Sequence, residues 1–232
     1  MIPKKIHYVW VGGKEKSADV KRCMATWQVH LKDYEIIEWN ENNFDMNMND
    51  YIKTAYEQKK WAYVSDFIRA YVIYHEGGIY LDTDVLVLDN LEQFLQNKAF
   101  VGFENPDYPF TAAFGAEQGH PFVKDMLNDF EGESFSFDKN DQMKNVNTKT
   151  VSDILIDKYH CQLGNQEQTL ETGIHVYPSG ILCNPSGNSS TIHVFTGTWM
   201  EGQKPLKRKI NKWFKIRTTS KAKAKCYQKL LS

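Results

Sequence analysis

The chain has 232 residues, of which 41% are hydrophobic and 25% charged, and these values are typical of a globular domain with a buried core. No run of eighteen apolar residues occurs and the first residues lack the apolar stretch of a signal peptide, so we expect neither a transmembrane helix nor a leader. The four cysteines are scattered without a C-x-x-C pair, which argues against a thiolate metal site or a disulfide framework and fits a reducing cytosol.

The formal net charge of −1 hides an asymmetry along the chain. Eleven of the 28 basic residues and none of the 29 acidic residues lie in residues 204–232, so residues 1–203 carry 17 basic residues against 29 acids, a net charge of −12. We therefore predict an acidic domain over residues 1–203 and a basic C-terminal tail over residues 204–232.

The first half of the chain alternates strand and helix patterns, which favours an α/β sheet. In chain order we expect a strand at 6–11, a helix at 18–30, a strand at 34–39 and a helix at 51–75. The last helix is interrupted near Lys59-Lys60 and stops at Gly77-Gly78, because glycine takes the left-handed conformation beyond a helix end at little cost.

The second half continues with shorter elements. Further strands are expected at 99–104, 111–115, 175–178 and 191–195, and further helices at 121–130 and 150–159. Residues 131–147 are polar and punctuated by glycine and asparagine, which predicts a loop or a mobile lid.

The segment 79–88 is the most informative part of the chain. It is an apolar run that carries Asp82 and Asp84 in its middle. If the run forms one strand, both aspartates point to the same face, because side chains alternate along a strand. Two neighbouring carboxylates repel each other and favour a hard divalent cation between them. The alternative is a pair of exposed aspartates at a strand end.

Three other features could contribute to a site. Asp66 and Arg69 lie one helical turn apart among apolar neighbours and would suit hydroxyl or phosphate recognition, although a surface ion pair is the usual outcome of this spacing. Trp10, followed by Gly12-Gly13, could stack on a planar base or be a core residue. His193 follows a strand and precedes a Gly-Thr-Trp turn, which makes it the best further metal-ligand candidate.

The pattern Ser65-Asp66-x-x-Arg69, then Gly77-Gly78-x-Tyr80-x-Asp82-x-Asp84, resembles the DXD-motif sugar transferases of glycosyltransferase family 32. That family includes capsular-polysaccharide transferases and mannosyltransferases, and the catalytic domains of large clostridial glucosylating toxins are similar. Residues 2–13 resemble its first strand, and residues 177–199 resemble its closing segment. The resemblance covers most of residues 1–200, with no firm anchor in 105–170.

The resemblance implies a GT-A fold, with a Rossmann-like mixed sheet flanked by helices, and a nucleotide-sugar donor. It implies that Val9 and Trp10 hold the base, assisted by Asn43, and that Asp66 and Arg69 contact the sugar and its phosphates. Mn²⁺ or Mg²⁺ would be bound by Asp84 and His193, with Asp82 bridging metal and donor. The closing residues Thr198 and Trp199 would complete the donor site; Thr198 departs from the serine that many relatives carry there.

These implications predict a metal-dependent, retaining hexosyltransferase in which Asp82, Asp84 and Arg69 serve catalysis. A UDP-sugar is the favoured donor and a saccharide, expected to be lipid-linked, is the acceptor, in cell-surface or capsular polysaccharide synthesis in bacteria. No enzyme nucleophile or base is assigned.

The basic tail interleaves cations with aromatic and aliphatic residues, which suits docking on an anionic membrane surface. We therefore expect a cytoplasmic protein, peripheral on the inner face of the cytoplasmic membrane. A solvated tail is the alternative; nucleic acid is not expected as a partner, because the acidic body would repel phosphates.

Two other functions remain open. A haloacid-dehalogenase-like, Mg²⁺-dependent phosphatase also carries D-x-D after an apolar strand. However, the hydroxyl residue expected two positions after the second aspartate is Leu86 here, and no later acidic pair is found. A sugar-nucleotide-binding module without turnover is the second alternative.

Overall fold

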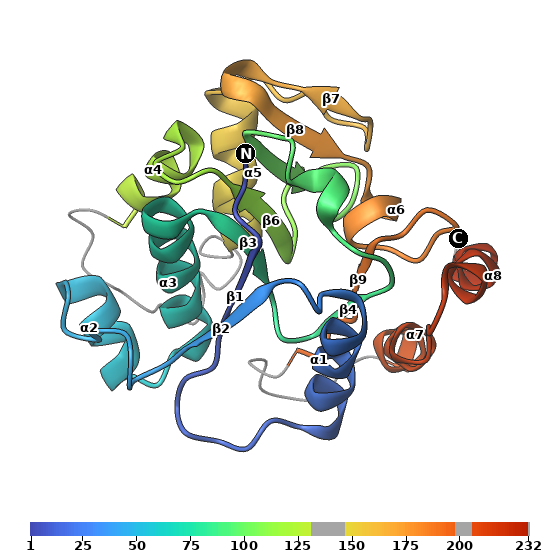
Figure 1. The fold of residues 1–232 in the computed structure, drawn as a ribbon, viewed down its shortest axis with the longest axis horizontal. Helices are drawn as coiled ribbons and strands as arrows, with labels where there is room; N and C mark the ends of the chain where they lie inside the picture. Colours follow the sequence, from blue (N-terminus) through green and yellow to red (C-terminus); the bar gives the residue numbers. More distant parts are fainter. Residues whose placement is uncertain (131–146, 198–205, 232) are drawn as a thin grey trace.

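A central seven-stranded sheet with helices on both faces organises the molecule (Figure 1), and the computed structural model describes residues 1–130, 147–197 and 206–231. Across the sheet the strand order is β2-β1-β3-β6-β5-β8-β7. Its strands are β1 (Lys5–Val9), β2 (Glu35–Trp39), β3 (Gly78–Leu81), β5 (Ala99–Gly102), β6 (Ala113–Ala116), β7 (Gln168–Thr169) and β8 (Ile174–Tyr177). A second sheet pairs β4 (Val85–Val87) with β9 (Thr191–His193).

The sheet is mixed, as the resemblance implied. β1 runs parallel to β2 and β3, and β5 runs parallel to β8, whereas β6 is antiparallel to both of its neighbours, β3 and β5. The helices are α1 (Ala18–His30), α2 (Asp50–Glu57), α3 (Trp61–Glu76), α4 (Pro121–Asn128), α5 (Asn147–Asp157), α6 (Ser179–Leu182), α7 (Leu206–Ile216) and α8 (Lys221–Leu231). The predicted α/β class, a mixed sheet flanked by helices, is confirmed.

Local sequence signals set the helix boundaries. The Ser17 hydroxyl accepts a hydrogen bond from the Val20 backbone N–H at the start of α1, and Asn49 caps α2 in the same way. Lys59 has a φ of 57°, which separates α2 from α3 at the predicted break. Gly77 ends α3 with a φ of 66°, a conformation that favours glycine.

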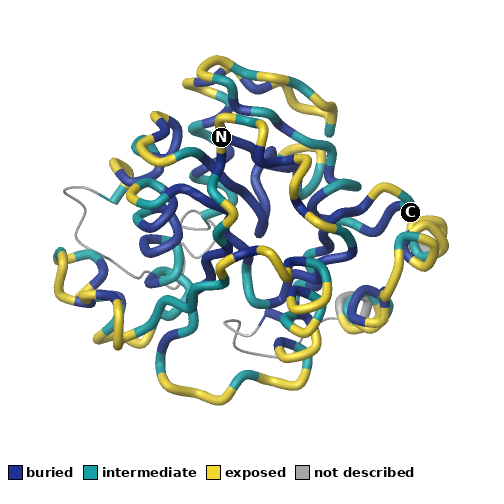
Figure 2. Tube along the Cα trace, in the orientation of Figure 1, coloured by how far each residue is buried: buried dark blue, intermediate teal, exposed yellow. Residues whose placement is uncertain are grey.

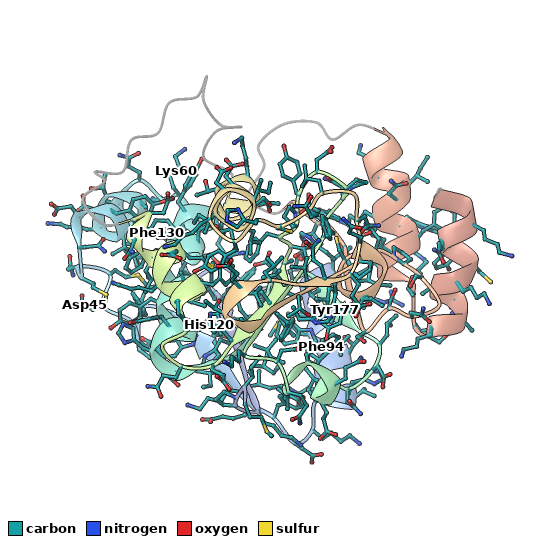
Figure 3. All side chains as sticks on the ribbon, turned by 90° about the horizontal axis from the view of Figure 1, so that it is seen from above. Asp45, Lys60, Phe94, His120, Phe130 and Tyr177 are labelled. Atoms are coloured by element: carbon teal, nitrogen blue, oxygen red, sulfur yellow. The ribbon has the colours of Figure 1, made fainter. Side chains whose placement is uncertain are left out.

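Two clusters of buried hydrophobic residues form the core, and Figure 2 marks the buried residues along the trace in dark blue. One cluster lies under α2 to α5 and includes Phe67 and Phe114. The other lies under α1 and the loops around β5, where Phe94 and Tyr177 meet edge to face with ring centroids 5.0 Å apart (Figure 3). The two clusters hold the strand ends in fixed positions, and the candidate site is built on those ends.

The C-terminal segment 206–231 forms two helices that pack at one edge of the body (Figures 1 and 3). Ile216 of α7 and Ala224 of α8 are buried in a small core with Leu86 of β4 and Ile192 of β9. The division at residue 203 stays a prediction, but the basic segment contributes to the packing of the small sheet.

The prediction of one continuous strand over 79–88 is wrong. β3 ends at Leu81 and β4 begins at Val85 in the other sheet, so the two aspartates lie in the turn between them. The backbone N–H of Val85 donates to the carbonyl of Asp82 at 3.0 Å and closes that turn. Both short strands are fully buried, and an unbroken apolar run therefore could not distinguish one strand from two.

None of the helices in the described residues combines the length and apolarity needed to cross a bilayer.

Candidate active site

Three parallel strands of the large sheet bring the predicted site residues to one edge. β2, β1 and β3 are neighbours, and their carboxyl ends lead into Asn43, Trp10 and Asp82 respectively. Ligands of open α/β sheets bind beyond the carboxyl ends of the strands. The topology thus places the expected nucleoside residues and the first aspartate along the same edge.

The turn after β3 meets the end of β9. Asp82, Asp84 and His193 each offer a ligand atom, and these atoms all lie within 4.8 Å of one another. The Nε2 atom of His193 lies 3.3 Å from Oδ1 of Asp84. The Nδ1 atom of the same ring is buried and has no hydrogen-bond partner in the described structure. Two carboxylates and an imidazole form a donor set that suits a divalent cation.

Asp84 is held firmly in place. Its Oδ2 atom accepts hydrogen bonds from the backbone N–H and the hydroxyl of Thr196, at 2.8 and 2.9 Å. Burial alone would favour the neutral acid. Attraction to His193 and the bonds from Thr196 outweigh burial and keep the pKa of Asp84 well below its usual range. Conversely, burial alone would lower the pKa of His193, but the charge of Asp84 raises it. Without a bound metal ion, these opposite shifts of the two pKa values favour the ion pair.

Arg69 joins two carboxylates on the other side of the turn. Its Nη2 atom lies 2.9 Å from Oδ1 of Asp66 and 3.1 Å from Oδ1 of Asp82. The guanidinium also stacks on the ring of Tyr80, 4.7 Å from the centroid. The Arg69 side chain is 10% exposed, so the alternative of a solvated surface ion pair is excluded.

Burial has the largest effect on the pKa of Asp66. Desolvation raises its pKa to about 6, although the nearby Arg69 opposes the shift. The Asn147 side-chain amide donates to Asp66 at 3.1 Å. This contact was not predicted, because no sequence pattern links residues 81 positions apart.

The residues expected to bind the nucleoside differ in their exposure and in the hydrogen bonds that their side chains already make. Val9 is buried in the core. Trp10 is half-buried, and its indole N–H donates to the carbonyl of Lys14 at 2.7 Å. Asn43 is exposed, but its side chain closes its own turn by donating to the carbonyl of Glu38 and accepting from the N–H of Asn40. The ammonium of Lys16 lies over the Trp10 ring, 5.2 Å from its centroid.

Two predicted residues, Thr198 and Trp199, lie outside the described residues. Sequence reasoning also missed Thr196, the hydrogen-bond donor to Asp84. The predicted Gly-Thr-Trp turn begins one residue after Thr196. The closeness of Thr196 to His193 in the sequence was therefore the signal that could have found it.

Comparison with known proteins identifies the segment that carries this site. Residues 17–101 match the family described as "Glycosyltransferase sugar-binding region containing DXD motif". The matched segment includes Asp66, Arg69, Asp82 and Asp84 and ends before His193. Residues 17–101 are thus similar to the sugar-binding region of the DXD glycosyltransferases. The resemblance seen in the sequence is thereby confirmed.

Two curated relatives are similar to part of the chain. One is "Inositol phosphoceramide mannosyltransferase 3" of Schizosaccharomyces pombe, 28% identical over 144 residues, which are 59% of this chain and 39% of the relative. The other is "Uncharacterized glycosyltransferase L373" of Acanthamoeba polyphaga mimivirus, 30% identical over 104 residues, which are 41% of this chain and 40% of the relative. The chain thus spans about two fifths of the length of both relatives.

Two solved structures are also similar. "PaToxG Glycosyltransferase" is 18% identical with a TM-score of 0.48, covering 68% of this chain and 70% of that one. A glycosyltransferase involved in glycosylation of the major capsid of PBCV-1 is 10% identical with a TM-score of 0.48, covering 90% and 97%. The description of the matched family and the names of the two curated relatives all refer to glycosyltransferases.

Proposed function

We propose that the protein is a metal-dependent, retaining glycosyltransferase that moves a hexose from a nucleotide diphosphate sugar to a saccharide acceptor. The observation that carries the proposal is the convergence of Asp82, Asp84 and His193 beside Arg69, within a chain that is similar to the DXD sugar-binding region over residues 17–101. Cleavage of the sugar–diphosphate bond leaves negative charge on the departing oxygens, and a transferase must stabilise that charge.

The three converging side chains fit Mn²⁺ or Mg²⁺. Their ligand atoms are close enough to share one ion, and the unpaired Nδ1 of His193 shows that this ring is not fully satisfied by the protein. A divalent ion bound there would act as a Lewis acid toward the diphosphate. Asp84 would be the firmest ligand, since Thr196 and His193 already fix its carboxylate.

Arg69 has a different task in this proposal. Its contacts with Asp66 and Asp82 and its stacking on Tyr80 leave the guanidinium in one position. Arg69 therefore orients Asp82, and its positive charge lies next to the place where the donor phosphates would be held.

The proposal is tested by titrating Mn²⁺ into the hydrolysis of nucleotide sugars with the wild type and Asp84→Asn. Asparagine keeps an oxygen for Thr196 but removes the charge, so the fold is retained while metal-dependent turnover falls at least about 100-fold. Asp89→Asn is the matched control, because Asp89 is a partly exposed aspartate that pairs with Lys221 at 2.6 Å. If Asp84→Asn turned over nucleotide sugars at the wild-type rate and still required metal, the assignment of Asp84 as a metal ligand would be refuted.

The donor is proposed to be a UDP-sugar, and the assay panel should also contain GDP-mannose. The S. pombe relative is named a mannosyltransferase, which makes mannose the first alternative sugar to test. Trp10 at the end of β1 is the proposed base platform. Trp10→Ala should raise the KM for the donor more than it lowers kcat, because stacking contributes to binding before and during reaction alike.

We also propose that the acceptor is lipid-linked, in cell-surface or capsular polysaccharide synthesis, and that the protein docks on the inner face of the cytoplasmic membrane. The support is the outer face of α7, where Ile210 and Trp213 are 45% and 50% exposed and Arg217 stacks on Trp213 at 4.2 Å. Cations interleaved with exposed apolar side chains suit an anionic interface.

Sedimentation with anionic vesicles tests this surface without removing the packed helices. The double variant Ile210→Ser/Trp213→Ser should lose most vesicle binding at constant stability. Val29→Ser is the control, because Val29 is an exposed apolar residue on α1. Equal sedimentation of all three proteins would exclude this face of α7 as the docking surface.

A further inference from the structure

Lys215 is a buried cation that the proposed chemistry does not use. It lies on α7 and is 6% exposed. Its ammonium donates to the carbonyl of His193 at 3.0 Å and to Oδ1 of Asn184 at 3.0 Å. It also lies over the ring of Phe195, 4.4 Å from the centroid. Lys215 is thus held by contacts with His193 at the end of β9, with Phe195 just after it, and with Asn184.

Lys215 contacts the backbone turn 193–196, which positions the proposed metal ligands Asp84 and His193. Phe195 has a φ of 59°, which is uncommon for a bulky residue, and its ring lies 3.8 Å from the ring of His193. On either side of Phe195, the N–H groups of Val194 and Thr196 donate to the backbone and side-chain oxygens of Asp84. Any relaxation of this turn would move His193 and Asp84 together.

Asn184 extends the same arrangement to a third element. Its side-chain amide donates to the carbonyl of Glu104, just beyond β5, at 3.0 Å, while its oxygen accepts from Lys215. One ammonium therefore connects α7, the end of β9 and the end of the large sheet. Lys212, another cation of α7, is partly exposed and pairs with Asp19 of α1 at 2.5 Å.

We propose that Lys215 is a positioning residue that holds the 193–196 turn in the conformation in which Asp84 and His193 can bind the metal. This inference rests on the proposed function for the identity of the bound metal. The role of Lys215 in holding the 193–196 turn does not depend on it. Residues that orient metal ligands through hydrogen bonds typically change metal affinity about 10- to 100-fold when they are removed.

Lys215→Met retains the length of the apolar stem and removes the ammonium, and Lys212→Met is the matched control on the same helix. Lys215→Met should weaken Mn²⁺ binding, measured by electron paramagnetic resonance, about 10- to 100-fold. The Mn²⁺ concentration for half-maximal turnover should shift by the same factor, and saturating Mn²⁺ should restore most of kcat. Lys212→Met should behave as the wild type in both measurements.

Amide hydrogen exchange of residues 190–197 without metal supplies a second readout. In Lys215→Met the N–H groups of Val194 and Thr196 should exchange at least about 10-fold faster, whereas Lys212→Met should leave them unchanged. If the wild type binds no Mn²⁺, the proposed metal fails and the exchange result alone decides the role of Lys215. Wild-type exchange in Lys215→Met would overturn the inference. Exchange raised equally along the whole chain would also overturn it, because that pattern marks general destabilisation.

Discussion

Replacing Arg69 by methionine tests whether its ion pairs are a buried structural clamp. Arg69 is in contact with Asp66 and Asp82 at 2.9 and 3.1 Å and is 10% exposed. Methionine keeps the apolar stem but leaves the two carboxylates without their cation. Removing one partner of a buried ion pair costs about 3–5 kcal/mol, since an uncompensated charge remains. Because Asp82 is 25% exposed and partly solvated, we expect the free energy of unfolding to fall by about 3 kcal/mol.

Urea unfolding at pH 7.5, followed by tryptophan fluorescence in the absence of metal, measures this loss. Lys4→Met is the control, because Lys4 pairs with Glu92 on the exposed surface and its loss should cost at most about 1 kcal/mol. A loss for Arg69→Met no larger than that of Lys4→Met would refute the reasoning. It would show that water solvates the two aspartates as well as the guanidinium does.

Three further predictions concern pH, backbone and metal. The folded-state pKa of Asp66, about 6, lies above its usual 3.8, so the native state binds the extra proton between these values. Stability should therefore rise by about 1–3 kcal/mol as the pH falls from 7 toward 4, and Asp66→Asn should abolish this contribution in urea titrations. Gly77→Ala places a Cβ 2.8 Å from the backbone nitrogen of Gln118 at positive φ and should cost more in thermal unfolding than Gly13→Ala, which has positive φ but open space around it. Mn²⁺ at 100 times its Kd should stabilise the wild type by about 2.7 kcal/mol in thermal unfolding, and Asp84→Asn should lose this gain.

The sequence was sufficient for most elements of the fold and for five side chains that lie together at the candidate site. Periodicity placed α1, and Gly77-Gly78 placed the end of α3, because these signals act locally. The motif spacing selected Asp66, Arg69, Asp82 and Asp84, and the setting of His193 after a strand selected the fifth residue that converges there. These predictions depended on short-range patterns that the fold preserves.

What failed depended on contacts between distant segments. Whether 79–88 forms one strand or two is decided by pairing with β6 and β9, which lie far along the chain. The ammonium of Lys215 is one of eleven cations in the basic segment, and nothing in its neighbours distinguishes the one that turns inward. Charge counting treated residues 204–232 as a single surface, whereas packing gives α7 a buried face and an exposed face.

The turn between the two sheets explains why the two aspartates of the motif are not equivalent. Asp82 follows β3, and Arg69 ties it to the helix layer of the large sheet. Asp84 precedes β4, and Thr196 and His193 tie it to the small sheet that α7 and α8 cover. An ion shared by both carboxylates would therefore link two separately supported parts of the molecule. The firm anchoring of Asp84 suits a direct metal ligand, while Asp82, the more exposed of the two, is free to bridge toward a donor.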